Sequence, residues 1–224
     1  MAKGKYLSDL YKSIENKTFN VEDAIKFIVD KKREKFDETI EISMNLGIDP
    51  RHADQMVRGV VSLPNGNGKV MKVAVFAKDK KAEEAKLAGA DVVGADDLAE
   101  DMQKGNLDYD RVIATPDLMG VVGRIGKILG PKGLMPNPKL GTVTPDVKSA
   151  VEAAKSGQVQ YRAEKNGLVQ AGIGKLSFGS DKLTENVNSF IEAIQKSRPT
   201  GAKGTFIKKI SISSTMGVGI NINI

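Results

Sequence analysis

The chain of 224 residues contains no cysteine and no tryptophan, and its one histidine is His52. Without cysteine, the chain can form neither disulfides nor thiolate metal sites. With a single histidine, the chain also has almost no residues that could form a zinc site or a His-based nucleophilic dyad. His52 follows the turn at Asp49-Pro50, where a histidine is usually a surface residue. We therefore expect a protein that is not an enzyme and that holds no metal and no cofactor.

Long apolar segments and aromatic side chains are also scarce. No apolar run approaches the roughly 20 residues that a membrane-spanning helix needs. The first five residues lack the apolar core of a secretory signal. Aromatic residues make up 5% of the chain, too few for the aromatic platform on which many RNA-binding sheets stack bases. We therefore expect a cytoplasmic protein that contacts no membrane.

The basic residues are unevenly distributed along the chain. The formal net charge is +6 and the isoelectric point is about 9.3. Residues 158–224 hold 9 Lys and Arg against 4 Asp and Glu, a net charge of +5, whereas residues 1–66 are neutral and residues 67–157 carry +1. A basic surface favours a polyanionic partner. The last third of the chain is thus the candidate for a phosphate-facing surface, with a plain solvated face as the alternative.

The middle of the chain alternates strand and helix patterns. Apolar strand patterns at 70–77, 91–94 and 111–114 are interleaved with helical patterns at 82–88 and 95–104. Thr115-Pro116 and Thr144-Pro145 each look like a helix start, with Thr as N-cap and Pro at the first helical position. Such alternation predicts a parallel sheet covered by helices.

The two ends of the chain do not show this regular alternation of strand and helix patterns. Asn20 is placed to cap a helix from Val21, and residues 39–44 alternate as a half-buried strand does. Residues 158–163 and 168–173 resemble a hairpin around Asn166-Gly167. The fold class that we predict is α/β and α+β in two domains. A discontinuous α+β terminal domain comprises residues 1–67 together with 158–224, and a Rossmann-like α/β domain of residues 68–157 is inserted into it.

The stretch 120–144 is rich in glycine, proline and lysine and looks at first like a phosphate loop. Its Gly126-Lys127 fails the Walker spacing, because Ile128 follows and Val121 stands where the first glycine belongs. No dinucleotide fingerprint follows the first strand of this region either. The glycines are more typical of a fixed connection within the inserted domain. An α/β enzyme that binds a phosphorylated small molecule through this stretch remains the alternative function, and a protein-interaction module is a third.

Two segments at opposite ends of the chain combine the groups that RNA binding needs. Lys31, Lys32, Arg33 and Lys35 precede Phe36, and residues 211–219 place hydroxyls beside glycines. Cations bind phosphates, hydroxyls bond 2′-hydroxyls, and glycine lets the backbone approach closely. If each residue is considered alone, Phe36 is expected in the core, and Ser213 and Thr215 are expected as polar residues on the solvent-exposed face of a strand.

Seven motifs stand in the same order as in a known family. The chain resembles the ribosomal protein L-one family of the large ribosomal subunit, and the run Gly130–Lys139 is the most specific of the matches. The motifs spread over most of the chain: Lys35–Thr39, Leu46–Pro50, Asp54–Gly59, Leu87–Asp91, Ala114–Asp117, Gly130–Lys139 and Ser214–Gly217.

This resemblance implies a structural constituent of the 50S subunit with an inserted middle domain. It implies binding to 23S rRNA at the mobile stalk near the tRNA exit site and help in releasing deacylated tRNA. It also implies repression of the protein's own operon through binding of its mRNA. The expected partners are therefore rRNA, exit-site tRNA and mRNA, for a protein that is a monomer when free.

The resemblance also assigns residues to the RNA interface. The terminal domain is expected to supply the principal contacts and the inserted domain accessory ones to stalk RNA or tRNA. Val218 and Gln170 depart from the usual proline and histidine of the family, and Val218 loosens φ in its turn. The expected principal contacts are Lys35, Phe36, Thr39, Gly174 and Lys175 in a turn, Ser213, Thr215, Met216 and Gly217, and the accessory ones are Arg124, Lys127 and Lys132.

Overall fold

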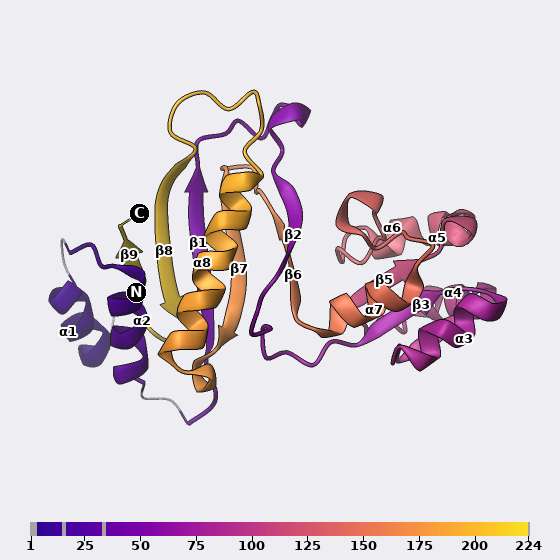
Figure 1. Ribbon diagram of the computed structural model, residues 1–224, viewed down its shortest axis with the longest axis horizontal. Coiled ribbons are helices and arrows are strands. Elements are labelled where there is room, and N and C mark those ends of the chain that lie inside the picture. The colour runs from indigo at the N-terminus through magenta and orange to yellow at the C-terminus, as the bar shows by residue number, and fades with distance from the viewer. Residues whose placement is uncertain (1–3, 15–16, 33–34, 224) are drawn as a thin grey trace. The chain divides into compact units, whose positions relative to one another are not determined.

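The computed structural model describes residues 4–14, 17–32 and 35–223 (Figure 1). Arg33 of the predicted basic segment lies outside the described residues. The contacts divide the chain into two compact units. Unit 1 comprises the residues up to Gly68 and from Val159 on, and unit 2 comprises Lys69–Gln158. Among the described helices, none has the length and apolar character that crossing a membrane requires.

Unit 1 is built on a four-stranded antiparallel sheet to which both ends of the chain contribute. The strand order is β7-β1-β8-β9, so β1 (Thr39–Leu46) lies between β7 (Leu168–Lys175) and β8 (Ile207–Ser214), and β9 (Ile220–Ile222) forms an edge. The helices α2 (Val21–Asp30) and α8 (Ser180–Lys196) pack on the sheet, and α1 (Lys5–Ile14) lies beside α2 (Figure 1).

The period-two pattern of β1 decides which face of this sheet is covered. Its even-numbered residues are buried in the core with the apolar stripe of α8, while Glu41 and Asn45 are exposed on the opposite face. Each fully buried side chain of this size contributes about 1.5–3 kcal/mol. The core residues of the two elements are Ile40, Ile42, Met44 and Leu46 in β1 and Leu183, Val187, Phe190 and Ile194 in α8.

The strands on either side of Asn166-Gly167 do not form the predicted hairpin. The turn itself is present, since the Gly167 N–H donates to Glu164 O at 2.9 Å. However, β6 (Gln158–Arg162) pairs with β2 (Arg58–Ser62) in a separate two-stranded sheet, whereas β7 pairs with β1. β1 and β7 are both eight residues long, and β2 and β6 are both five, so each strand is matched in length by its actual partner.

Unit 2 contains the predicted parallel sheet covered by helices. Its strand order is β4-β3-β5, and both pairs are parallel. Every residue of β3 and β5 is buried, because apolar clusters lie on both sides of the sheet. The elements are β3 (Val73–Phe76), β4 (Val92–Gly94), β5 (Arg111–Ala114), α3 (Asp79–Leu87), α4 (Asp96–Gln103), α5 (Met119–Arg124), α6 (Gly126–Leu129) and α7 (Val147–Lys155).

Of the two Thr-Pro helix starts, the first is confirmed in position, with Thr115 as N-cap and Pro116 as the first helical residue, and the second is wrong. After Thr115 the chain forms a 3₁₀ turn, Pro116–Leu118, before α5 begins, and the Thr115 side chain makes no capping hydrogen bond to any described residue. The N-cap of α7 is Asp146 rather than Thr144, because the Asp146 carboxylate accepts from the Ser149 N–H at 3.2 Å. The Thr144 hydroxyl accepts instead from the Asp146 N–H at 3.2 Å and so helps to hold Asp146, the N-cap residue, in position.

The first half of the glycine-rich stretch is helical and is not the loop that its glycines suggested at first. α5 and α6 follow each other with only Ile125 between them. Gly120 and Gly123 are exposed, and a Cβ added to either would have no described atom within 4 Å. The packing of unit 2 therefore does not require glycine at these two positions.

This observation predicts that Gly120→Ala and Gly123→Ala stabilise unit 2. Glycine inside a helix costs roughly 0.5–1 kcal/mol relative to alanine, and neither position has a positive φ. We expect hydrogen exchange of the β3 amides, which reports opening of unit 2, to slow by up to about fivefold in each variant. Gly94→Ala is the control, since its Cβ would lie 2.8 Å from Leu98 Cβ and should destabilise unit 2. Faster exchange in the Gly120 and Gly123 variants would contradict the packing argument.

Candidate nucleic-acid interface

Most of the residues predicted to bind RNA come together at one end of the four-stranded sheet. Thr39 begins β1, whereas Lys175 ends β7 and Ser214 ends β8. Because β1 runs antiparallel to both neighbours, its start lies beside their ends, and Thr39 pairs with Lys175 while Ile40 pairs with Ser214. We call this place the sheet tip and define it as residues 35–39, 174–175 and 214–217.

Two threonines join the two halves of the sheet tip. The Thr39 N–H donates to Thr215 Oγ1 at 3.0 Å, and the Thr215 hydroxyl donates to Thr39 O at 3.3 Å. The Lys175 ammonium donates to Thr39 Oγ1 at 2.8 Å. The three predicted contact residues therefore hold one another, and their first role is to keep the turn after β8 beside the start of β1.

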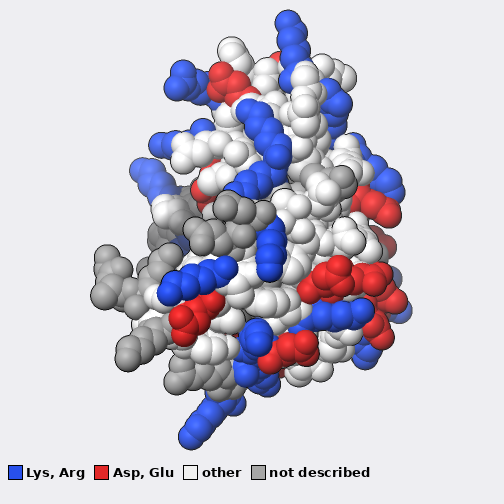
Figure 2. Space-filling model, turned by 90° about the vertical axis from the view of Figure 1, so that its left-hand side faces the viewer, with Lys and Arg blue, Asp and Glu red and all other residues white. Residues whose placement is uncertain are grey.

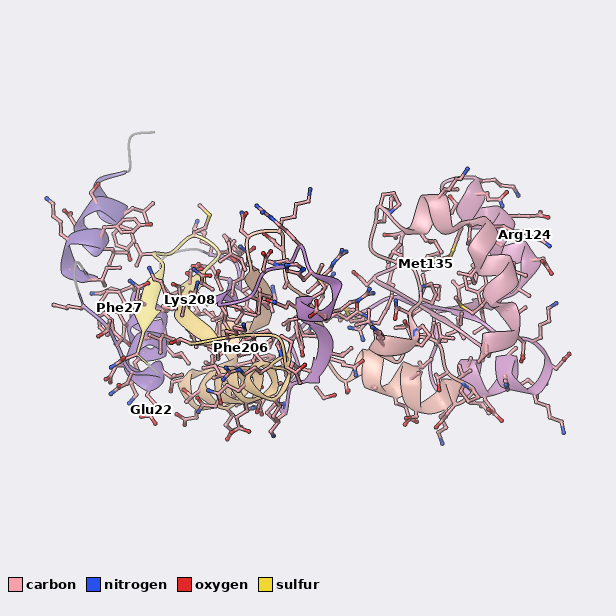
Figure 3. The ribbon with its side chains drawn as sticks, turned by 90° about the horizontal axis from the view of Figure 1, so that it is seen from above. Glu22, Phe27, Arg124, Met135, Phe206 and Lys208 are labelled. Carbon is pink, nitrogen blue, oxygen red and sulfur yellow. The ribbon has the colours of Figure 1, made fainter. Side chains whose placement is uncertain are left out.

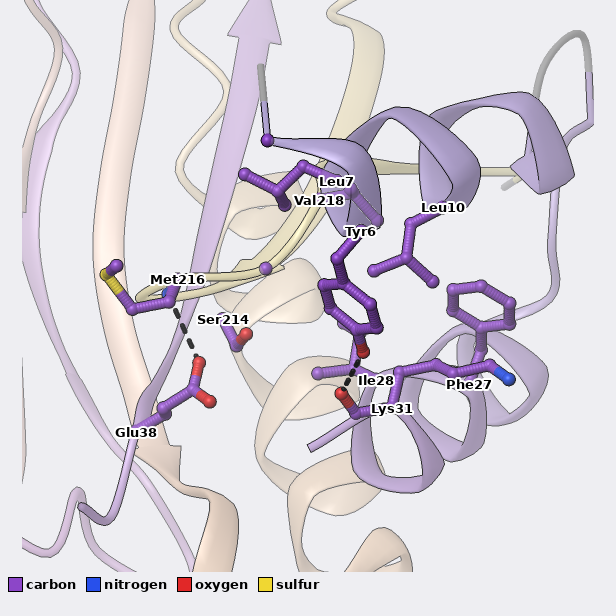
Figure 4. Close-up of a pocket in the computed structure, with 12 residues that line it drawn as sticks. Tyr6, Leu7, Leu10, Phe27, Ile28, Lys31, Glu38, Ser214, Met216 and Val218 are labelled. Atoms are coloured by element: carbon purple, nitrogen blue, oxygen red, sulfur yellow. Dashed lines mark hydrogen bonds between the residues drawn. The ribbon is translucent and has the colours of Figure 1, made fainter. Parts of the chain in front are cut away.

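Glu38 is a further member of the sheet tip that the sequence did not single out. Its side chain is only 3% exposed, and Glu38 Oε2 accepts from the Met216 N–H at 3.1 Å (Figure 4). A buried carboxylate needs such donors, because an unpaired charge in the interior is costly. The signal in the sequence was weak, since Glu38 stands among charged residues that are mostly exposed.

Gly217 leaves room for the Ser214 hydroxyl inside the turn. A Cβ at this position would lie 2.4 Å from Ser214 Oγ, far closer than real Cβ atoms come. The Gly217 N–H also donates to Ser214 O at 3.2 Å, which closes the turn. Ser214 is buried, whereas Ser213 pairs with Glu41 one step further along the sheet. Ser213 is therefore half-buried in β8 and not part of the sheet tip.

Gly174 and Lys175 do not form the predicted turn, because they are the last two residues of β7. A Cβ on Gly174 would lie 2.9 Å from Leu183 Cδ2 of α8. The glycine thus allows α8 to pack closely on the sheet, which is a structural reason for its presence. A 3₁₀ turn, Leu176–Phe178, follows the strand.

Two large apolar side chains are exposed at the sheet tip. Met216 is 56% exposed and Phe36 is 48% exposed, so Phe36 is not the core residue that it would be if taken singly. Lys32 and Lys35 are exposed close to Phe36 in the sequence. Cations next to exposed apolar and aromatic faces suit single-stranded RNA, whose phosphates and unstacked bases they can contact together.

Charge alone does not mark this site. On the face of unit 1 that carries α1 and α2, Lys and Arg side chains are spread widely, while Asp and Glu gather in the lower part of the view (Figure 2). The tip itself includes Asp37, whose carboxylate accepts from the Ser177 hydroxyl at 2.7 Å and from the Ser177 N–H at 3.0 Å. The combination of lysines with exposed apolar side chains is therefore the more specific feature.

The predicted accessory residues lie in unit 2. Arg124, Lys127 and Lys132 are all exposed, and Arg124, labelled in Figure 3, is the last residue of α5. Met135, also labelled there, packs near Gly126, where an added Cβ would lie 3.7 Å from Met135 Cε. Between residues 118 and 140 the sequence has four basic residues and no acidic one. This segment therefore presents a small cationic surface of its own.

The two departures from the family pattern have different environments. Val218 is 3% exposed and belongs to the core of unit 1, so its side chain contributes apolar packing at the end of the turn. Gln170 is exposed on β7 and pairs in register with Ser43. Neither residue displaces a group of the sheet tip.

His52 is largely exposed, and its Nε2 lies 4.0 Å from Asp49 Oδ2. Within the described ranges, no three His, Asp or Glu side chains gather as a metal site would require. The arrangement at the sheet tip is one of hydrogen-bonded scaffold and exposed contact groups, which is suited to binding.

The contact between Asp37 and Ser177 predicts a measurable pKa change. The Ser177 hydroxyl, followed by its N–H, lowers the pKa of the Asp37 carboxyl below its usual value. The contact therefore stabilises the fold at neutral pH, and this contribution is lost below about pH 4, as the pH falls through the folded-state pKa. Ser177→Ala should raise the pKa of Asp37 in a ¹³C NMR titration. The pKa of Asp91, lowered mainly by the Val73 N–H, should stay unchanged, and an unchanged Asp37 would contradict the assignment.

Comparison with known protein families accounts for this arrangement. A family model described as the ribosomal protein L1p/L10e family matches residues 20–218. The match includes residues of both units and every candidate contact residue from Lys35 to Gly217. The chain therefore belongs to the ribosomal protein L1p/L10e family, which makes it a ribosomal protein with a structural role in the ribosome and the ability to bind ribosomal RNA.

Proposed function

We propose that the protein binds 23S rRNA at the mobile stalk of the large subunit, near the tRNA exit site, and that the sheet tip makes the principal contacts. The observation that carries this proposal is that Phe36 and Met216 both belong to the sheet tip. These two exposed apolar residues are 180 positions apart in the sequence. Both belong to the sheet tip because β1 pairs with β8.

In this proposal the contact groups divide into two kinds. Lys35 binds phosphate, while the side chains of Phe36 and Met216 contact base and ribose faces. The backbone at Gly217 is open to close approach. Thr39 and Thr215 act indirectly, because their hydrogen bond holds the turn in position before RNA arrives, and Glu38 also holds the turn through the Met216 N–H. A turn that is already ordered loses less conformational entropy on binding, which favours affinity.

We further propose a division of labour between two domains. Residues 1–67 together with 158–224 form the RNA-binding domain, and residues 68–157 form an inserted domain. The inserted domain contributes Arg124, Lys127 and Lys132 as accessory contacts to stalk RNA or exit-site tRNA. Their exposure and the absence of acidic residues from 118–140 support this assignment.

Release of deacylated tRNA and repression of the protein's own operon are part of the same proposal. An mRNA segment that folds like the stalk RNA would occupy the same sheet tip, so free protein would bind its message only when rRNA is saturated. The protein would do this as a monomer in the cytoplasm, without a cofactor. The alternative, an enzyme for phosphorylated small molecules, loses support because residues 119–129 form helices instead of the loop it would use.

The double variant Thr215→Ala/Met216→Ala tests the sheet tip. It removes the hydroxyl that bonds Thr39 and the most exposed apolar side chain of the tip. We expect binding to a stalk-derived rRNA fragment to weaken at least tenfold in a filter assay, since one base contact alone is worth about 1–3 kcal/mol. Met56→Ala is the matched control, because Met56 is an exposed methionine of unit 1 outside the tip.

The wild-type affinity should also fall steeply with salt, because lysines that bind phosphates release counterions. Unchanged affinity of the double variant, with a native circular dichroism spectrum, would remove the principal contacts from the sheet tip. Equal losses in Met56→Ala would show that the effect is not specific to this place.

A further inference from the structure

A cavity of about 160 Å³ lies directly beside the sheet tip. It is enclosed by α1, the C-terminal half of α2 and the turn after β8 (Figure 4). Its walls are mainly apolar, with Leu7, Leu10, Phe27, Ile28 and Val218. A cavity of similar size with apolar walls holds a benzene molecule in another protein. The space therefore suits one six-membered ring.

One end of this cavity is polar, where the Glu38 carboxylate and Ser214 lie, with Met216 next to them (Figure 4). Tyr6 stands among the lining residues in the middle of the view, where its hydroxyl donates to Lys31 O at 2.7 Å and connects α1 to α2. A flat ring with apolar faces and a hydrogen-bond donor on one edge would match these walls and the Glu38 end.

The position of Glu38 is fixed before any ligand arrives. Glu38 Oε2 accepts from the Met216 N–H at 3.1 Å, and the side chain is 3% exposed. A carboxylate accepts from the exocyclic amino group of cytosine, which has one ring and a donor at its edge. Uracil has a carbonyl oxygen in place of that amino group, which a carboxylate repels, and purines have two rings, so cytosine fits both the size and the chemistry.

The cavity is continuous with the surface proposed to bind RNA. Met216 and Gly217 belong to the sheet tip and also line the cavity. We propose that one unstacked cytosine of the bound RNA enters this cavity and donates its amino group to Glu38. This inference rests on the proposed function, and it adds a base-specific site to a surface whose other contacts are to phosphates and base faces.

Filling the cavity provides the first part of the test. Leu7→Phe on α1 enlarges a half-buried wall residue, and Ile14→Phe makes the same change on the same helix outside the cavity. Each variant and the wild type are titrated with the stalk-derived rRNA fragment and with copies in which single cytidines are made abasic. In the wild type, one abasic position should weaken binding about tenfold.

The variants should then separate the cavity from the rest of the surface. Leu7→Phe should bind the intact fragment about tenfold more weakly than the wild type does. Its affinity should be the same for the intact fragment and for the fragment with the critical abasic position. Ile14→Phe should behave as the wild type does. Replacing the critical cytidine by uridine should weaken wild-type binding and have little effect on Glu38→Gln, whose amide oxygen can still accept from the Met216 N–H. Additive effects of Leu7→Phe and the abasic position would overturn the proposal.

An NMR measurement on the wild type keeps the test decisive if Leu7→Phe does not fold. The methyl resonances of Leu10, Ile28 and Val218 should shift with the intact fragment and shift much less with the critical abasic one. Unmoved methyl resonances in an RNA complex would overturn the cavity proposal while leaving the sheet tip standing. Failure of the wild type to bind any stalk-derived fragment would instead contradict the proposed function.

Discussion

The pairing of β1 with both β7 and β8 is the constraint on which the rest of unit 1 depends. It joins Thr39 to Thr215 across 176 positions of sequence. The entropy cost of closing such a loop grows only with the logarithm of its length. Much of the intervening chain forms unit 2, which has its own apolar clusters. An inserted unit is therefore compatible with the pairing, and the sheet tip exists only where both ends of the chain have folded together.

At the sheet tip, polar side chains are turned inward and apolar side chains are exposed, which is the reverse of the usual arrangement in proteins. Thr39 and Thr215 direct polar atoms toward each other, and Glu38 accepts from the Met216 N–H, whereas the side chains of Phe36 and Met216 are exposed to solvent. Single exposed apolar residues are common on protein surfaces. Here Met216 lies on the turn that the buried carboxylate holds, and Phe36 lies shortly before β1, so the sheet tip presents two exposed apolar side chains. Such a surface gains more from the flat faces of bases than from a purely ionic partner, which agrees with the small net charge of the chain.

Sequence patterns predicted which segments form strands and helices better than they predicted which strands pair. The alternation in β1 and the strand–helix alternation of unit 2 are local periodicities, so both could be found from the sequence. The pairing of β6 with β2, and of β7 with β1, depends on strands far apart in the chain, and the turn at Asn166-Gly167 carried no information about it. Family resemblance located the sheet tip, but the supporting role of Glu38 appears only once its neighbour Met216 is placed.

The glycines show why a motif can identify a family without revealing what its residues do. Gly217 avoids a collision with Ser214, and Gly174 lets α8 approach β7. Gly120 and Gly123 have no such neighbour among the described residues, although glycine weakens the helix that contains them. Nothing described within unit 2 requires glycine at these positions, so any advantage of glycine there would come from outside unit 2. A partner that approaches the backbone of α5 closely beside Arg124, as in the proposed accessory contact, would supply that advantage.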